Sequence, residues 1–257
     1  MENFRLALWP RDRFSPAVIG AFLNALGILL GALWGLARRE PPSAATQKYF
    51  QSALGAFTAF CGLQLVWLNV GGNFSTVVKQ LFIAALAVVL GNWLGKLLGL
   101  QKISNRLGRH AGALLGGGTP SVKIRPADGF TGATILFCAA PLGILGAVTD
   151  GLSDYFFPLA LKAAMDGLAM TSFVKTFRWP VALAAIPVFV FLYLLSLGVR
   201  LGARPLLEAP ALIASVNAAA GLVACATALV VLGVRRVELT NYLPALLVAP
   251  LLTWLVR

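Results

Sequence analysis

The chain has 257 residues, of which 59% are hydrophobic and only 12% are charged. A soluble domain is nearer a quarter charged, so this composition excludes an ordinary globular protein and indicates an integral membrane protein. The formal net charge is +12, but the basic residues lie mainly between apolar blocks and accompany no nucleic-acid-binding motif. We therefore expect the lipid bilayer, and no nucleic acid, as the partner.

Apolar segments of the length that a membrane helix needs, about 20 residues, recur along the chain. The short alternating segments of a β-barrel do not occur in the sequence. We predict an all-α protein: a polytopic transmembrane helical bundle of about eight spans that forms a single integral membrane domain. The predicted spans are 17–36, 52–70, 81–100, 130–148, 156–174, 180–198, 210–233 and 241–255.

The first and third predicted spans carry glycine at every fourth residue. These glycines are Gly27, Gly31 and Gly35 in the first span and Gly91, Gly95 and Gly99 in the third. Such spacing makes a flat groove along one helix face, which lets another backbone approach closely. It predicts helix packing, either within the chain or across a homodimer; a glycine-lined permeation path is the alternative.

The connection 101–128 is basic and rich in glycine. Within it, residues 103–115 alternate basic and apolar side chains, which is typical of an amphipathic segment that rests on anionic headgroups. Lysine and arginine are more frequent in the odd-numbered connections than on the other side. The positive-inside rule therefore predicts that the 101–128 loop is cytoplasmic and that both termini lie outside.

The segments 51–62 and 216–227 resemble each other weakly. Each begins near a polar amide, Gln51 or Asn217, and runs through small residues to a cysteine. The two spans would point in opposite directions, so the likeness suggests an inverted three-helix repeat. The repeat would place a three-span unit at 1–100 and another at 177–257 around the central span pair 129–176.

The most unusual stretch is 143–169, which holds three of the nine acidic residues of the chain. Lys162 lies four residues before Asp166, so the two side chains share a helix face within pairing distance. One interpretation is a salt bridge in which the two charges neutralise each other and have no further role. Asp154 is interpreted most simply as a solvated charge or a helix cap. Ionisable residues inside a membrane usually face a cavity or a pathway, however, which favours a functional role for Asp150 or Asp166.

Glycines follow both of these aspartates, at Gly151 and Gly167, and could expose backbone carbonyls as cation ligands. Polar side chains in or at the ends of other spans could contribute to the same site. The candidate substrate- or ion-binding residues are Asp150, Gly151, Lys162, Asp166, Gly167, Asn24, Asn217 and Asn241. For the three asparagines, a hydrogen bond between helices is the competing and simpler interpretation.

Enzymatic interpretations find little support in the sequence. His110 is the single histidine and lies in the predicted loop, so no Ser-His-Asp triad or histidine metal site can form in the membrane. An intramembrane protease dyad of Asp150 and Asp166 is a distant alternative, because it requires two carboxylates that share a proton. The sequence contains no phosphate-binding or dinucleotide-binding motif. We expect no enzyme, no cofactor and no metal.

The segments AFLNALGILLGALWG, GATILFCAAPLGILGAVTDGL, LKAAMDGLAMTSF and RRVELTNYLPALLVAP, in this order, resemble the bacterial membrane-protein family called "domain of unknown function 554", which includes YqgA-like and YdfK-like proteins. The resemblance covers nearly the whole chain. It implies a helical inner-membrane protein, regarded as a transporter without an established substrate. The positions that carry over are Asn24, Asp150, Gly151, Lys162, Asp166, Gly167, Asn241 and Pro244. Ser215 departs from the family pattern, which often has an acidic residue at that place.

Together these features predict a secondary transporter or channel-like carrier in the bacterial inner membrane. It would move a small solute or cation, with Asp150 and Asp166 near a midplane site. The alternative is a scaffold that transports nothing and binds lipid or a partner helix through its glycine faces.

Overall fold

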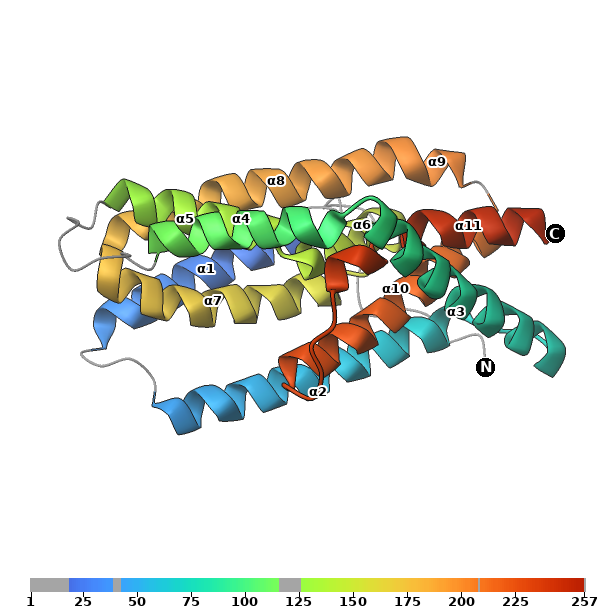
Figure 1. Ribbon diagram of the computed structural model, residues 1–257, viewed down its shortest axis with the longest axis horizontal. Helices are drawn as coiled ribbons and strands as arrows, with labels where there is room; N and C mark the ends of the chain where they lie inside the picture. Colours follow the sequence, from blue (N-terminus) through green and yellow to red (C-terminus); the bar gives the residue numbers. More distant parts are fainter. Residues whose placement is uncertain (1–18, 39–42, 116–125, 208, 257) are drawn as a thin grey trace.

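The computed structural model describes residues 19–38, 43–115, 126–207 and 209–256, and every regular element in these ranges is helical. Most helices follow one long axis, so the bundle is elongated (Figure 1). The predicted all-α membrane bundle is confirmed. The start of the first predicted span, 17–18, and the part 116–125 of the predicted loop lie outside the described residues.

The helices follow one another with short connections. The main ones are α1 (Ile19–Ala37), α2 (Ala44–Asn69), α3 (Phe74–Leu97), α4 (Leu100–Leu115), α5 (Pro126–Ala139), α6 (Pro141–Ser153), α7 (Phe157–Phe177), α8 (Ala185–Gly198), α10 (Pro210–Val231) and α11 (Ala245–Leu255). The short ones are η2 (Trp179–Ala184), η3 (Val199–Ala203), α9 (Arg204–Leu206) and η4 (Leu239–Tyr242).

The predicted number of eight spans is not confirmed. Within the described residues, 5 helices are long and apolar enough to cross a bilayer, or 6 if α5 and α6 together form one span. The long helix Trp179–Leu206, which joins η2, α8, η3 and α9, is one of the 5. The helix α7 falls short because Lys162 and Asp166 interrupt its apolar sequence, and the segment Leu239–Leu255 falls short in length.

The predicted span 130–148 is two helices rather than one. The axes of α5 and α6 differ by 56° at the break between Ala139 and Pro141. Proline has no backbone N–H and disfavours the helical conformation in the residue before it. Ala140 accordingly has extended backbone angles, φ −66° and ψ 122°, and Pro141 begins the new helix α6. The proline therefore causes the bend.

The closest helix pairs join distant parts of the sequence. The helix α1 packs mainly on α7, α2 on α10, and α3 on α11, and α2 and α10 run side by side in Figure 1. Gly62 and Gly221 bring α2 and α10 together, because a Cβ on either glycine would lie within 2.8 Å of the carbonyl oxygen of the other. Of the first predicted three-span unit, α2 and α3 thus pack on helices of the second unit, whereas α1 packs mainly on α7 of the central pair. The inverted repeat itself stays a prediction.

The glycine faces of α1 and α3 lie inside the chain. Gly27, Gly31 and Gly35 face α7, where a Cβ on each would collide with the backbone or side chain of α7. Gly91 and Gly95 likewise face Ala245 and Asn241. The prediction for Gly99 was wrong: it ends α3 in a left-handed conformation, φ +65°, in which glycine is favoured, and packs against no helix.

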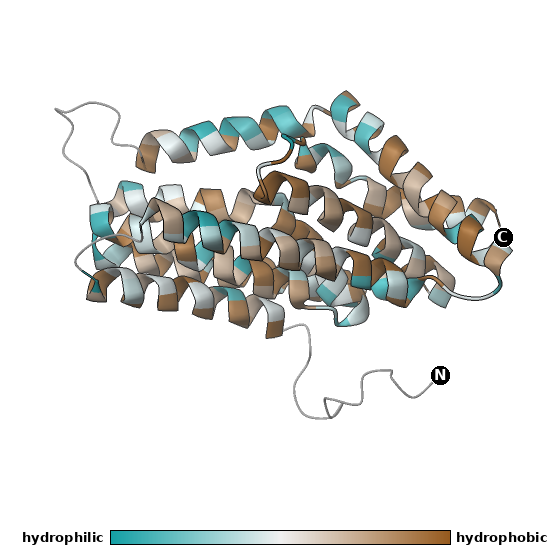
Figure 2. Cartoon of the chain, turned by 90° about the horizontal axis from the view of Figure 1, so that it is seen from below, coloured by the Kyte–Doolittle hydropathy of each residue, from teal (hydrophilic) through white to brown (hydrophobic). Residues whose placement is uncertain are grey.

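Hydrophobic residues, drawn in brown, recur along the helices of the bundle (Figure 2). Large hydrophobic side chains such as Leu33, Trp67, Phe82 and Trp93 are each more than 60% exposed, which suits a lipid environment rather than water. The helix α4 differs, since most of its side chains are hydrophilic or small and only Ala111 is buried. It packs along α5, and its predicted contact with lipid headgroups stays a prediction.

Candidate functional site

A buried ion pair joins α1 and α7. Lys162 and Asp166 form a salt bridge one helical turn apart on α7, and Asn24 of α1 donates its Nδ2 hydrogen to Asp166 Oδ2 at 3.0 Å. The residues Asn24, Lys162 and Asp166 are 0%, 1% and 6% exposed. The Oδ1 atom of Asn24 has no hydrogen-bond partner among the described residues. The structure therefore brings together three of the predicted site residues in a closed interior.

The Lys162 side chain lies against the break between α5 and α6. Its Nζ atom is 5.6 Å from the centre of the Phe137 ring, in the last turn of α5. Its stem passes Gly143 in the first turn of α6, where an added Cβ would lie 2.7 Å from Lys162 Cε. A cation over an aromatic face is attracted by the ring electrons, and a glycine leaves room for the stem. The ammonium group thus lies at the one strongly bent helix pair found in the described residues.

Asp150 lies close to this pair but takes no part in it. It is 0% exposed, and neither of its carboxylate oxygens has a hydrogen-bond partner in the described parts of the chain. Its Oδ2 atom lies 2.9 Å from the place that a Cβ of Gly20 would occupy. Gly20 is one turn before Asn24 on α1, so Asp150 and Asp166 meet successive turns of α1.

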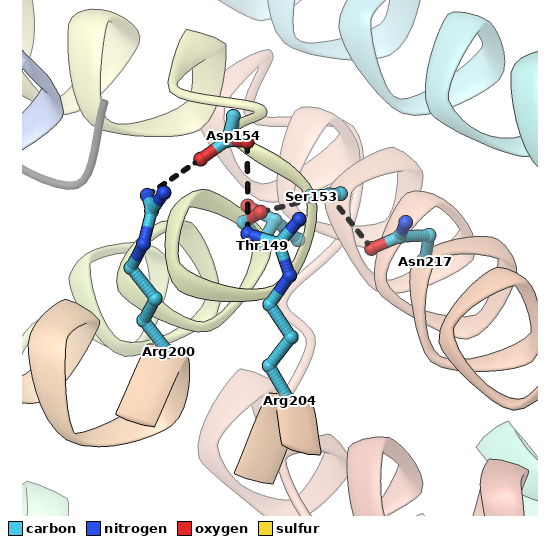
Figure 3. Close-up of polar contacts among 6 residues, drawn as sticks. All are labelled: Thr149, Ser153, Asp154, Arg200, Arg204 and Asn217. Carbon is cyan, nitrogen blue, oxygen red and sulfur yellow. Dashed lines mark hydrogen bonds and ion pairs between the residues drawn. The ribbon is translucent and has the colours of Figure 1, made fainter. Parts of the chain in front are cut away.

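A third aspartate lies at the edge of the bundle. Asp154 ends α6 in a left-handed conformation, and its carboxylate accepts a hydrogen bond from Arg200 at 2.9 Å, with Arg204 at 3.7 Å. Figure 3 shows the two arginines reaching Asp154 from η3 and α9. The Asp154 side chain is 35% exposed. The sequence-based interpretation as a cap or a solvated charge missed these ion pairs.

Asn217 belongs to a different polar group, on the α10 side of α6. It donates to Asn69 Oδ1 at 3.0 Å and accepts from Ser153 Oγ at 3.3 Å (Figure 3). These bonds join α2, α6 and α10, and they use both ends of the Asn217 amide. The structure therefore supports the simpler interpretation for Asn217, a hydrogen bond between helices.

Asn241 does not reach the buried ion pair either. Its Oδ1 atom accepts from the backbone N–H of Gln101 at 3.0 Å, and its Nδ2 atom donates to Glu238 at 2.7 Å. Gln101 also bonds to η4 through its side chain: its Oε1 atom accepts a hydrogen bond from the backbone N–H of Thr240 at 3.3 Å. Asn241 thereby binds an unpaired N–H in the first turn of α4 and holds that end of α4 on η4.

We expect Asn241→Ala to release the start of α4 while the rest of the bundle stays folded. Loss of a cap at a helix N-terminus costs about 1 kcal/mol. Hydrogen exchange measured by mass spectrometry should show faster exchange of the amides at 100–104, and the amides of α7 should exchange as in the wild type. Faster exchange throughout the bundle would contradict a local role for Asn241.

Two predicted binding glycines prove to be packing positions. A Cβ on Gly151 would lie 2.5 Å from the backbone oxygen of Ser196, and one on Gly167 would lie 2.6 Å from that of Gly27. A neighbouring helix thus fills the space on the Cβ side of each glycine. The predicted role of the nearby carbonyls as cation ligands stays a prediction. The sequence alone gave no sign of which helix would fill the space.

Several residues near the charges were missed by the sequence analysis. Ser196 of α8 is 0% exposed, and its hydroxyl has no partner among the described residues. It is the only polar side chain in the apolar run 185–198 apart from Tyr193. This isolation in the sequence could have identified Ser196 as a candidate site residue. The contacts of Phe137 and Gly143 with Lys162 depend on the bend at Pro141 and could not be read from spacing.

One open groove of the molecule lies away from the charges. A groove of about 770 Å³ between α2 and α3 is lined mainly by apolar side chains such as Phe60, Trp67 and Leu81. It faces outward, so lipid rather than a polar solute suits it. Across the described residues, no three His, Cys, Asp or Glu side chains converge in a way that could hold a metal ion. The buried charges are therefore the feature that calls for a functional explanation.

Comparisons with known proteins place these features in a wider group. Residues 19–254 match the family model described as "Protein of unknown function (DUF554)". The chain is 29% identical over 241 residues to "Uncharacterized protein YqgA" of Escherichia coli (strain K12), which covers 90% of this chain and 94% of that protein. It is 23% identical over 243 residues to "Uncharacterized membrane protein YdfK" of Bacillus subtilis (strain 168), which covers 93% and 97%. No solved structure matches the chain.

Proposed function

The chain belongs to the DUF554 family, and from this premise and the buried charges we propose that it is a secondary transporter or channel-like carrier of a small solute or cation. The membrane would be the bacterial inner membrane. Asn24, Lys162 and Asp166 form the central site, and Asp150 lies one turn of α1 away. The observation that carries the proposal is the buried Lys162–Asp166 ion pair beside the broken helix pair α5–α6.

This observation favours transport for two physical reasons. A buried ion pair is weak evidence for stability, because apolar side chains of similar volume often stabilise a protein equally well. Broken membrane helices occur where the chain lines a site, since their free backbone groups need partners that lipid does not provide. The two features meet at Lys162. A cation that binds Asp166 would displace the Lys162 ammonium group. The site would then have two states, an empty one in which Lys162 pairs with Asp166 and a loaded one in which the cation does.

The scaffold alternative loses its main support. It required glycine faces that are free to receive lipid or a partner helix. Gly27 and Gly31 are covered by α7, and Gly91 and Gly95 are covered by Ala245 and Asn241 of the same chain. An aspartyl-protease dyad also lacks support, because Asp166 bonds to Lys162 and Asn24 and shares no hydrogen bond with Asp150.

The proposal is tested by a ligand screen followed by flux measurements. Purified protein is heated in the presence of Na⁺, K⁺, different pH values and a panel of small metabolites. A ligand at 100 times its dissociation constant stabilises the protein by about 2.7 kcal/mol, which is visible as a shift in Tm. Flux of that ligand into proteoliposomes should be saturable, and Asp166→Asn should abolish it. Saturable flux that is unchanged in Asp166→Asn would overturn the proposed site.

A further inference from the structure

We propose that Asp150 carries a proton in the resting protein and exchanges it with water through the Asp154 end of α6. The ion that drives the carrier is then the proton. The coupling rests on the proposed function, whereas the protonated state of Asp150 stands on the geometry alone. The proton transfer is simple: the O–H bond of the Asp150 carboxyl forms with a proton from water and breaks to return it.

The Asp150 carboxyl group is isolated in the interior of the bundle. Asp150 is 0% exposed, and neither oxygen accepts a hydrogen bond from any described residue. An ionised carboxylate in such a place would lose its hydration with little compensation beyond the nearby Ser196 hydroxyl of α8, at a cost of several kcal/mol or more. A buried carboxyl group without partners therefore takes up a proton and becomes neutral.

The cations of the neighbouring helices already have partners. Lys162 of α7 pairs with Asp166, and Arg200 and Arg204 both bind Asp154. The described part of α1 contains no ionisable residue, and α8 and α10 place only Ser196 and Asn217 near α6. No described cation is left over within pairing distance of Asp150. With Asp150 neutral, the interior charges of Lys162 and Asp166 therefore balance each other.

The space around the Asp150 carboxyl group is tightly packed on the side of α1. On the α1 side, Oδ2 lies so close to Gly20 that a Cβ there would be 2.9 Å away, and Leu159 fills the adjoining space. A metal cation needs several oxygen ligands around it as well as room for itself. A proton needs neither. The close packing at Gly20 therefore favours a proton over Na⁺ at Asp150.

The proposed route from this carboxyl group to water runs along α6 to its Asp154 end. Asp154 follows Asp150 by one helical turn, about 5.4 Å, and its backbone N–H donates to the Asp150 carbonyl at 3.0 Å. Asp154 and Arg200 are partly exposed at 35% and 25%. Among the described residues, two arginines share the single Asp154 carboxylate at this edge, so one positive charge is in excess there. This excess charge would stabilise the Asp150 carboxylate at the moment when its proton leaves.

On the inner side, α1 leads from Asp150 to the ion pair. Gly20 faces Asp150, and Asn24, one turn further, donates to Asp166. The three aspartates thus form a series that leads from the partly exposed Asp154 to the buried Asp150 and Asp166. Loss of a proton from Asp150 would place a negative charge one turn of α1 from the Lys162–Asp166 pair. This charge would alter the electrostatic interactions that keep the Lys162 ammonium group on Asp166.

Infrared spectroscopy tests the protonated state directly. Purified full-length protein at pH 7 should show the C=O band of a protonated carboxylic acid, and Asp150→Asn should lose this band. Asp154→Asn, a matched change at the exposed carboxylate, should keep it. The band should shift when the sample is moved to D₂O, since the proton exchanges with water, and it should disappear reversibly as the pH is raised. A band that persists unchanged in Asp150→Asn would overturn the proposal.

Thermal unfolding supplies a second, independent readout. Asparagine resembles a neutral carboxyl group in shape and charge, so Asp150→Asn should unfold at about the wild-type Tm. Asp166→Asn breaks an ion pair and should lower Tm markedly. A large loss of Tm in Asp150→Asn, or an infrared band that NaCl removes and KCl does not, would instead indicate an ionised Asp150 with a bound cation. If the band belongs to Asp150 while the carrier shows no flux of any kind, the proposed function falls and the protonated state stands.

Discussion

Lys162→Met is expected to destabilise the bundle by about 3–5 kcal/mol, because it leaves the Asp166 carboxylate as an uncompensated charge in the interior. Lys162 is 1% exposed, and its ammonium group is the only cation bonded to Asp166 among the described residues. Water cannot replace this partner in a closed site. Thermal unfolding of the purified variant in detergent should show a large fall in Tm relative to the wild type.

The matched control removes both charges together. In the double variant Lys162→Met with Asp166→Asn, the new amide can still accept the hydrogen bond from Asn24, and no charge is left unpaired. Replacement of a whole buried ion pair is often neutral or stabilising, so most of the lost stability should return. The same double variant should be folded but unable to transport. If the double variant were as unstable as Lys162→Met, or if it transported as well as the wild type, the pair would not have the role proposed for it.

The sequence predicted the composition of the site better than its geometry. Spacing along one helix was enough to place Lys162 and Asp166 in contact, since residues four apart always share a helix face. The contact with Asn24 joins α1 to α7 across 142 positions of sequence. Such a contact depends on which helices pack together, and helical periodicity carries no information about that choice.

The asparagines illustrate the same limit. All three were polar residues in apolar surroundings, and each could have been a ligand or a bond between helices. The structure separates them: Asn24 meets the ion pair, Asn217 joins α6 to α2 and α10, and Asn241 holds the start of α4. What distinguishes them is the neighbouring helix and not any property of asparagine. The bend at Pro141, by contrast, followed from proline chemistry, but the sequence analysis had merged α5 and α6 into one span.

The few polar groups of the site depend on how the helices around them pack. Lys162 needs the bend at Pro141 to lie between Phe137 and Gly143. The pair needs α1 to approach α7 closely enough for Asn24 to reach Asp166. That approach depends on small residues along both helices. The glycines of α1 are therefore as important to the site as the charges themselves.

Gly31→Ala is expected to destabilise the protein by about 3 kcal/mol and to weaken the bond between Asn24 and Asp166. A Cβ at this position would collide with the backbone of Gly167 on α7. Overpacking costs about 1–3 kcal/mol where side chains can adjust, and here the obstacle is rigid helix backbone, so the upper end applies. The helices α1 and α7 would have to separate. Thermal unfolding should show the loss of stability, and transport should fall with it.

The control is the same substitution at a glycine without neighbours. Gly108 lies in α4, and apart from its own helix backbone no atom of the described residues lies within 4 Å of the place where its Cβ would be. Alanine favours a helix over glycine by about 0.8–1.0 kcal/mol, so Gly108→Ala should be neutral or slightly stabilising. Opposite effects of one methyl group at the two positions would show that close approach of α1 to α7 is the cause. Equal effects would mean that Gly31 acts only through helix propensity, and the packing explanation for the site would fail.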